Sequence, residues 1–179
     1  MKSPGAIARR AVRDRLADPA TGWNAIIGPI AEEYGAPPIP LNFHGQSRNV
    51  ENALRNPDDF DMSRMNGRLM LSIGVQESVE ASDGRTMAMF SGITTVVLQF
   101  LYIERVNLND PEYDAFIERS EYIADAIEDC CLQILNDPSV MYPGMTPARA
   151  FQCVRGATQP LRDGIQKPIL VQLQFQVEQ

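Results

Sequence analysis

The side chains in this sequence that could do chemistry are few and poorly placed for catalysis. The single histidine, His44, follows Phe43 beside a proline-rich stretch. A hydrolytic site needs a base, a nucleophile and an orienting acid that converge in space, and no serine lies in a strand-to-helix elbow that could supply the nucleophile. Gly156 and Gly164 match neither dinucleotide-binding nor Walker spacing. We therefore expect no enzymatic activity and no cofactor.

An acidic run is the one sequence feature that could hold a metal ion. Asp58, Asp59 and Asp61 offer clustered carboxylates, which suit hard cations such as Ca²⁺. The run lacks the glycine turn and closing glutamate of a calcium-binding loop. We favour a solvated acidic loop that contains no metal, and we count these three aspartates among the candidate interface residues.

The cysteines predict neither a metal site nor a disulfide framework. Cys130 and Cys131 are neighbours in a predicted helix, where successive side chains point about 100° apart. Cys153 is distant in the sequence. Buried free thiols are the simplest interpretation.

Length and composition indicate one soluble domain. The 179 residues suffice for a substantial core, and 44% hydrophobic with 22% charged residues is ordinary for a globular protein. We expect a single domain over 1–179, with an N-terminal helical arm at about 1–35 and a long loop at about 45–67. No apolar run approaches the roughly 20 residues that span a membrane, and the N-terminus lacks a signal-peptide core. We expect a cytoplasmic protein with no membrane partner.

Charge is divided unevenly along the chain. Five basic residues and one acidic residue give residues 1–15 a charge of +4. Because the whole chain has a net charge of −7, the remaining residues carry −11. The acidic body would repel nucleic acid, and we expect no specific nucleic-acid partner. A basic arm on an acidic body suggests docking onto an acidic surface such as an identical subunit, although a solvated helix face is the alternative. The candidate interface arginines are Arg9, Arg10, Arg13 and Arg15.

Hydrophobic periodicity predicts two helices in the N-terminal arm. Apolar residues recur at helical spacing over 5–17, with arginines on the other side. Thr21 is the predicted N-cap of a second helix that reaches Tyr34, and Gly28-Pro29 is expected to break or kink it. The prolines that follow allow only an extended segment through Phe43.

Two strands and a turn are predicted in the middle of the chain. Residues 69–75 alternate as a strand facing the core, and 82–85 has the composition of a hairpin turn. The returning strand, 93–104, is apolar at both alternating sets of positions, which predicts a central strand covered on both faces. Met87 and Met89 lie in the returning arm and are candidates for a subunit contact.

The clearest helix is predicted over 111–135, with Asp110 as its N-cap and Pro111 as its first residue. Its apolar stripe runs over about six turns, and its exposed side is acidic. Residues 139–148 read as loop and 150–157 as a strand. The last strand begins at Ile169 and alternates apolar residues with glutamines to the end of the chain. These elements predict an α+β fold: a mostly antiparallel sheet, with the long helix packed on one face and an N-terminal helix.

The order of these elements resembles the tail terminator (tail completion) proteins of long-tailed bacteriophages. The resemblance rests on the arginine-bearing N-terminal helix, the extended segment 37–41, the strand 92–100 leading to an acidic helix that ends at 134–136, and the final strand Ile-Leu-Val-Gln-Leu-Gln-Phe-Gln-Val. It covers most of the chain as a pattern of elements. The long 45–67 loop and the extended 138–168 region depart from the family pattern.

The resemblance implies a structural virion protein without catalysis, assembled in the host cytoplasm and located in the tail or neck. In that family identical subunits form a ring, usually hexameric, that stops growth of the tail tube and joins the tail to the head. Its partners would be the tail-tube protein and neck or connector proteins. The departures leave open a head-tail connector or head completion protein. A small binding module or enzyme subunit that uses the groove beside the long helix is the alternative from another class.

Overall fold

The computed structural model describes residues 4–37, 39–41, 68–79, 92–107, 109–136, 145–161 and 164–177. The helices in these residues are α1 (Pro4–Leu16), α2 (Trp23–Glu33) and α4 (Tyr113–Leu135). The strands are β1 (Arg68–Val79), β2 (Gly92–Glu104), β3 (Met145–Arg155), β4 (Gln159–Leu161) and β5 (Gly164–Val177). The fold is α+β, as predicted.

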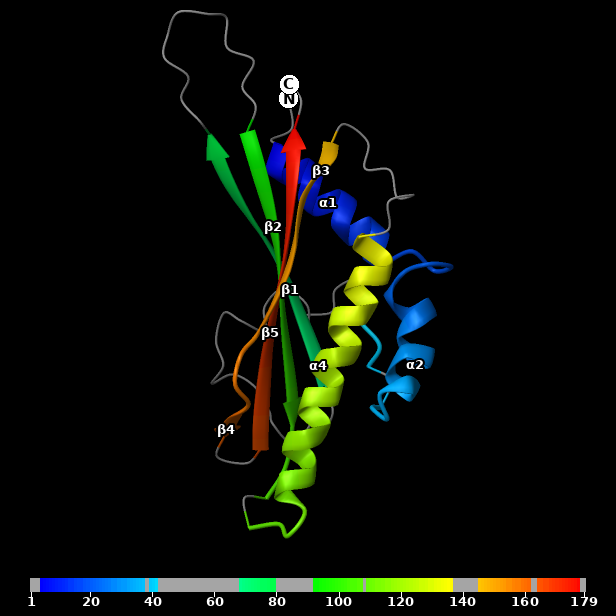
Figure 1. Cartoon of the computed structure of the whole chain (residues 1–179), viewed down its shortest axis with the longest axis vertical. Helices are drawn as coiled ribbons and strands as arrows, with labels where there is room; N and C mark the ends of the chain where they lie inside the picture. The colour runs from blue at the N-terminus through cyan, green and yellow to red at the C-terminus, as the bar shows by residue number, and fades with distance from the viewer. Residues whose placement is uncertain are drawn as a thin grey trace, which may run out of the picture.

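The strands form one antiparallel sheet of five strands in the order β1-β2-β5-β3, with β4 also paired to β5. The two long central strands, β2 and β5, pair from Gly92 opposite Val177 to Glu104 opposite Ile165. The strands are long and strongly twisted (Figure 1). The terminal strand therefore lies at the centre of the sheet, where the predicted alternation places its apolar residues against the core.

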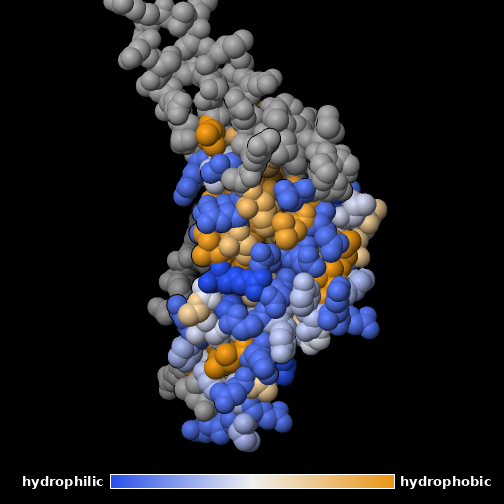
Figure 2. Space-filling model, in the orientation of Figure 1, coloured by the Kyte–Doolittle hydropathy of each residue, from blue (hydrophilic) through white to orange (hydrophobic). Residues whose placement is uncertain are grey.

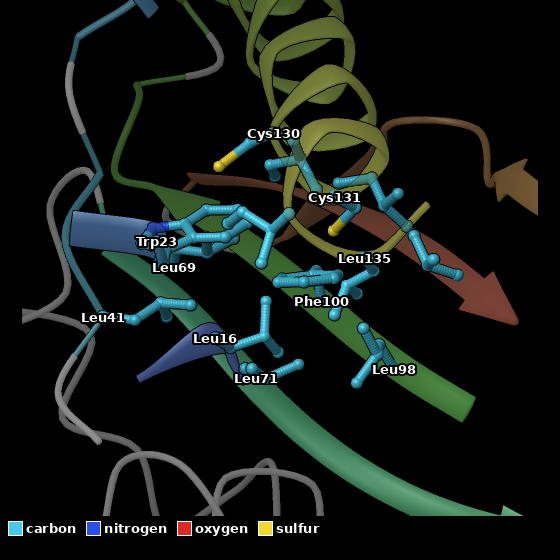
Figure 3. Packing of buried hydrophobic residues seen from close by; sticks show 14 of the residues in the cluster. Leu16, Trp23, Leu41, Leu69, Leu71, Leu98, Phe100, Cys130, Cys131 and Leu135 are labelled. Atoms are coloured by element: carbon cyan, nitrogen blue, oxygen red, sulfur yellow. The ribbon is translucent and has the colours of Figure 1, made fainter. Parts of the chain in front are cut away.

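All three described helices pack on one face of the sheet (Figure 1). The core beneath them joins apolar residues of α1, α2 and α4 to one alternating set from each long strand. Trp23 stacks on Phe100, with ring centroids 5.3 Å apart, and its indole nitrogen donates to the carbonyl of Ile39 at 2.8 Å. Figure 3 shows Leu16 and Cys131 in the same packing. The hydrogen bond from Trp23 to Ile39 satisfies the polar atom of a side chain that is otherwise buried in the core.

Helix α4 buries the predicted stripe, including Ile123, Ile127 and Ile134, all with no exposed surface. Its predicted beginning is wrong by two residues, because the helix starts at Tyr113 and Glu112 occupies the N-cap position. The Asp110 carboxylate instead accepts a hydrogen bond from the Glu112 amide at 2.9 Å. The aspartate therefore organises the turn before the helix.

The second helix also begins differently from the prediction. Gly22, not Thr21, is the N-cap of α2. Asp18 holds the connection, because its carboxylate accepts hydrogen bonds from the amides of Ala20 and Thr21, each at 2.8 Å. These bonds hold the pKa of Asp18 below its usual range. Helix α2 is continuous through Pro29, so the break expected there is not seen.

Two further expectations about strands are corrected. The helices cover only one face of β2, and on the other face Ile93 is 42% exposed and Gln99 is also exposed. The expectation that β2 is covered on both faces is therefore wrong at Ile93 and Gln99. It is confirmed at Val97 and Ile103 of the same face, which are buried. Strand β3 begins at Met145, within the segment predicted as loop, and pairs with β5 with a register shift between Ala148 and Phe151. The predicted turn at 82–85 lies outside the described residues.

Candidate interaction surfaces

Two of the four candidate arginines on α1 bind the body of their own subunit. The Nε atom of Arg9 donates to the carbonyl of Ile73 in β1 at 3.0 Å. The Nε atom of Arg15 donates to the carbonyl of Ile134, near the end of α4, at 3.2 Å. These side chains fasten α1 to an edge strand and to the end of α4. Sequence periodicity could not separate them from the other arginines, because their partners are backbone atoms distant in the sequence.

Arg10 and Arg13 lie on the exposed side of α1. Arg10 forms an ion pair with Asp14, one helical turn later, at 3.4 Å, and the two side chains are 71% and 65% exposed. Exposed ion pairs of this kind contribute little to stability. These two arginines are therefore the more exposed pair among the four on α1.

The remaining candidates cannot be placed. Asp58, Asp59 and Asp61 lie outside the described residues, as do Met87 and Met89. The same holds for His44 and the whole of the predicted 45–67 loop.

The acidic surface of α4 is divided into a neutralised part and an open part. Arg155, at the end of β3, forms ion pairs with Asp125 and Glu128, and its Nε lies 2.9 Å from a Glu128 oxygen. Partial burial acts to lower the pKa of Arg155, but the bonds to these two carboxylates outweigh it and raise the pKa. The second half of α4 therefore has much of its negative charge balanced within the subunit.

The open part lies at the start of α4. Glu112, Asp114 and Glu118 are exposed, and none of them forms an ion pair with another described residue. The described surface in the lower half of Figure 2, where α4 begins, is mostly hydrophilic. Arg119, the next residue along the helix, is 38% exposed and pairs with Glu104 rather than with these three carboxylates. The start of α4 is therefore rich in carboxylates that no described cation pairs with.

A polar cluster lies beneath the first half of α4, at the end of the otherwise apolar core. Tyr102 and Glu104 are successive core-facing residues of β2, and both carboxylate oxygens of Glu104 are used. One accepts from the Tyr102 hydroxyl at 2.8 Å, and the other pairs with Arg119 of α4 at 3.0 Å. Burial, together with the hydrogen bond to Glu104, raises the pKa of Tyr102 well above its ordinary value.

Lys167 is the second charged group of this cluster. It lies opposite Tyr102 on β5, is 2% exposed, and forms an ion pair with Glu121 of α4. The Thr158 hydroxyl lies 3.3 Å from the same Glu121 oxygen and 2.9 Å from the Ser120 hydroxyl. These groups satisfy one another, which is what buried polar atoms require. Glu121, one of the acidic residues expected on the exposed side of this helix, is therefore an anchor between α4 and the sheet.

The face of the sheet turned away from the helices carries no charge among its described side chains. Its described glutamines are Gln76, Gln99, Gln152, Gln159, Gln166, Gln172 and Gln174. Its larger apolar residues are Ile93, Val97, Leu101, Ile103, Val154, Pro168 and Leu170. Ser72, Gly74 and Thr95 complete it. We call these residues the uncharged sheet face.

A shallow hollow of about 290 Å³ lies on this face, lined almost entirely by apolar atoms. Leu101, Pro168, Leu170 and Val154 form its walls, with Gln99 as a polar lining residue. Val154 is 45% exposed, so the hollow is next to solvent-accessible apolar surface. Ligand pockets of small molecules combine apolar walls with several convergent polar groups. This hollow lacks that polar set and fits an apolar side chain better than a metabolite.

The three thiols are free, as predicted, with Cys130 and Cys131 buried and Cys153 half-buried. Burial raises the pKa of Cys153 to about 11, with a smaller contribution from Glu128. Within the described ranges, no three His, Cys, Asp or Glu side chains gather as a metal site would require. None of the described helices is long and apolar enough to cross a membrane.

Comparison with known proteins adds no relative: no protein-family model matches the chain, and no curated protein matches it.

Proposed function

We propose that this chain is a structural virion protein whose copies form a ring that ends a bacteriophage tail tube and joins the tail to the neck. It acts through interfaces with identical subunits, the tail-tube protein and neck proteins, without catalysis. Support comes from the resemblance in the order of elements and from an α+β fold with a long helix on an antiparallel sheet.

The observation that carries the proposal is the separation of opposite charges within one subunit. Arg15 places α1 beside Ile134, near the end of α4, whereas Glu118 lies sixteen residues earlier on the same helix. At about 1.5 Å per residue, this is roughly 24 Å along the helix axis. Figure 1 shows α1 at one end of α4 and the first turn of α4 at the other.

Charges so far apart cannot neutralise each other within the subunit, because salt screens exposed charges beyond about 8–10 Å. Arg10 pairs with Asp14 in its own subunit, but that pair is exposed. The exposed side of α1 that carries Arg10 and Arg13 can therefore still meet Asp114 and Glu118 of the next copy. Such a contact uses two different surfaces and is therefore head-to-tail, the kind of contact that closes into a ring when the rotation fits.

The mass of the assembly tests this proposal. We expect multi-angle light scattering at low salt to give a discrete ring, and electron microscopy to show closed particles. Reversal of two exposed charges, Arg10→Glu with Arg13→Glu, should slow assembly while the far-ultraviolet circular dichroism stays unchanged. Arg9 and Arg15 are left in place because they bind backbone carbonyls of their own subunit.

A control variant removes charge elsewhere. Glu32→Gln with Glu33→Gln, on the exposed end of α2, should leave the assembly rate unchanged. A stable monomer at low salt, or equal assembly rates for wild type and the double arginine variant across a salt series, would contradict the proposed ring. Flanking genes for capsid, portal and tail-tube proteins would support it independently.

A further inference from the structure

The two long outer strands of the sheet, β1 and β3, have different free edges (Figure 1). A free edge exposes a row of backbone amides and carbonyls, and proteins generally blunt such edges with proline, a bulge or charge. In β3, Pro147 lacks an amide hydrogen, and the register on β5 shifts between Ala148 and Phe151. β1 contains no proline and pairs with β2 without a shift from Arg68 to Val79. The edge of β1 is therefore the regular one.

One contact shows which backbone groups of β1 face outward. Arg9 of α1 donates from its Nε atom to the carbonyl of Ile73 at 3.0 Å. A carbonyl that bonds to β2 points into the sheet, so the Ile73 carbonyl lies at the free edge. Alternate residues of an antiparallel strand turn their amide and carbonyl to the same side, so Leu69, Leu71 and Val75 also face outward. Among the described residues, none donates to or accepts from the outward groups of these three.

The middle of this edge is accessible to another chain. Gly74 and Gln76 are exposed, and Val75 is half-buried. Because glycine has no side chain, exposure at Gly74 is exposure of the backbone itself. When an extended segment adds to such an edge, main-chain hydrogen bonds give affinity and the alternating side chains of the segment give specificity.

The charge beside the edge selects the partner. Arg9 contacts the edge itself, and Arg13 lies one helical turn later on the same side of α1. Residues 1–15 together have a charge of +4. Every second side chain of a strand added to β1 would lie on the helix-covered side of the sheet, beside these arginines. A carboxylate at those positions can accept charge-assisted hydrogen bonds from guanidinium groups.

The edges of a second copy of this chain fit this site poorly. Pairing of β1 with β1 about a two-fold axis would bring two basic α1 helices together, and like charges at an interface are costly. Pairing of β1 with β3 of another copy would set a regular edge against one that contains Pro147 and a register shift. An acidic strand from a different protein avoids both conflicts.

We propose that the free edge of β1 binds an extended acidic segment of another protein. The segment pairs antiparallel to β1, as all the described strand pairs do, and presents a carboxylate to α1 at every second residue. Residues directly opposed in such a pair have side chains on the same face and exchange both main-chain bonds. The carboxylate-bearing residues therefore bond to Leu71, Ile73 and Val75. The Ile73 carbonyl accepts a second bond beside Arg9, because a carbonyl oxygen has two lone pairs.

The probe is a fluorescently labelled synthetic peptide of about eight alternating glutamate and threonine residues, since threonine favours extended backbone. We expect fluorescence anisotropy at about 0.15 M NaCl to show saturable binding to the full chain, with a dissociation constant below about 1 mM. The same peptide with lysine in place of glutamate should bind at least about 10-fold more weakly, because its charges oppose those of α1.

Backbone methylation provides a matched pair of control peptides. Methylation of the central glutamate amides removes the donors that face β1 and should abolish binding. Methylation of the central threonine amides, which point away from β1, should change the dissociation constant by no more than about threefold. A purely electrostatic attraction between peptide and α1 would not distinguish the two peptides.

A substitution in β1 locates the site on the protein. Val75→Pro removes one outward amide but no bond to β2, so it should weaken binding at least about 10-fold in a folded chain. Val75→Thr keeps the amide and the β-branched shape and should bind as wild type does. Circular dichroism verifies folding, and if Val75→Pro does not fold, the methylated peptides decide. No saturation at about 1 mM, or equal affinity for the two methylated peptides or for the glutamate and lysine peptides, would overturn the proposal. Peptide affinity and ring mass are measured separately, so this proposal and the ring can fail independently.

Discussion

The two halves of α4 pack against different parts of the same sheet face. The second half, from Ile123 onward, packs on apolar residues of the sheet. Ile123, Ile127 and Ile134 are fully buried there in the hydrophobic core. The first half covers the polar cluster, where Arg119 and Glu121 hold Glu104 and Lys167 of the sheet.

This difference separates two ways of fixing a helix. Apolar burial is strong but tolerates small shifts, since a side chain can slide against its neighbours at modest cost. Paired charges require defined geometry, because a buried ion without its partner is costly. The apolar half therefore supplies most of the attachment energy, and the polar half fixes where α4 lies along the sheet.

The largest effect is expected in the apolar half. Ile127→Ala should lower the free energy of unfolding by about 2–5 kcal/mol, because it removes buried methyl groups and leaves a cavity. Urea unfolding followed by circular dichroism measures this. The control is Glu118→Ala on the exposed side of the first half, which should change stability by no more than about 0.5 kcal/mol. Equal losses at the two positions would show that α4 is rotated about its axis relative to this description.

A smaller loss is expected when the polar half is broken. Glu121→Ala leaves the ammonium group of Lys167, 2% exposed, without its carboxylate. We expect a loss of about 1–3 kcal/mol, below the 3–5 kcal/mol typical of fully buried pairs because the Glu121 side chain is 47% exposed. The double variant Glu121→Ala with Lys167→Met should recover most of this loss. If the double variant is no more stable than the single one, the buried charge is not the cause.

The sequence predicted the apolar half well and the polar half poorly. Periodicity identifies a buried stripe such as Ile123, Ile127 and Ile134, because burial of apolar residues repeats with the helix. Glu121 has the residue type of a solvated position, and its function depends on Lys167, 46 residues away in the chain. A charged partner supplied by another element leaves no local pattern. Lys167 also lay before the predicted last strand, which was expected to begin at Ile169 but begins at Gly164 in the structure, so no signal in the sequence marked this pair.

The sequence predicted only part of the uncharged sheet face. The alternating glutamines of the last strand correctly predicted a polar outer face, confirmed by Gln172 and Gln174 beside the buried Val171 and Leu173. The absence of charge among the described side chains of neighbouring strands could not be predicted without the order and register of those strands. Strand 93–104 suggested cover on both faces, whereas its second face is buried at Val97 and Ile103 and exposed at Ile93 and Gln99.

The half-buried thiol of Cys153, in strand β3, predicts a loss of stability in alkali. Cys153 has a pKa of about 11 in the folded chain against 9.0 ordinarily, mainly because of burial. The unfolded chain therefore releases the thiol proton first as the pH rises, so the stabilising contribution is complete below about pH 9 and declines up to about pH 11. Urea unfolding at a series of pH values measures the decline. Cys153→Ser should reduce its slope, and an unchanged slope would assign the decline to other groups.

The smallest effect is expected where α4 is held only at the surface. Arg155 binds Asp125 and Glu128, but its side chain is 36% exposed and those of its partners are about as open, so water and salt compete for the same charges. Arg155→Ala should lower the free energy of unfolding by no more than about 1 kcal/mol, and this difference should shrink as ionic strength rises. The Glu121→Ala loss should persist in the same salt series, because the Lys167 side chain is only 3% exposed and is shielded from counterions. A salt-insensitive loss above about 2 kcal/mol at Arg155 would place it with the buried cluster and remove the distinction between the two halves of the helix.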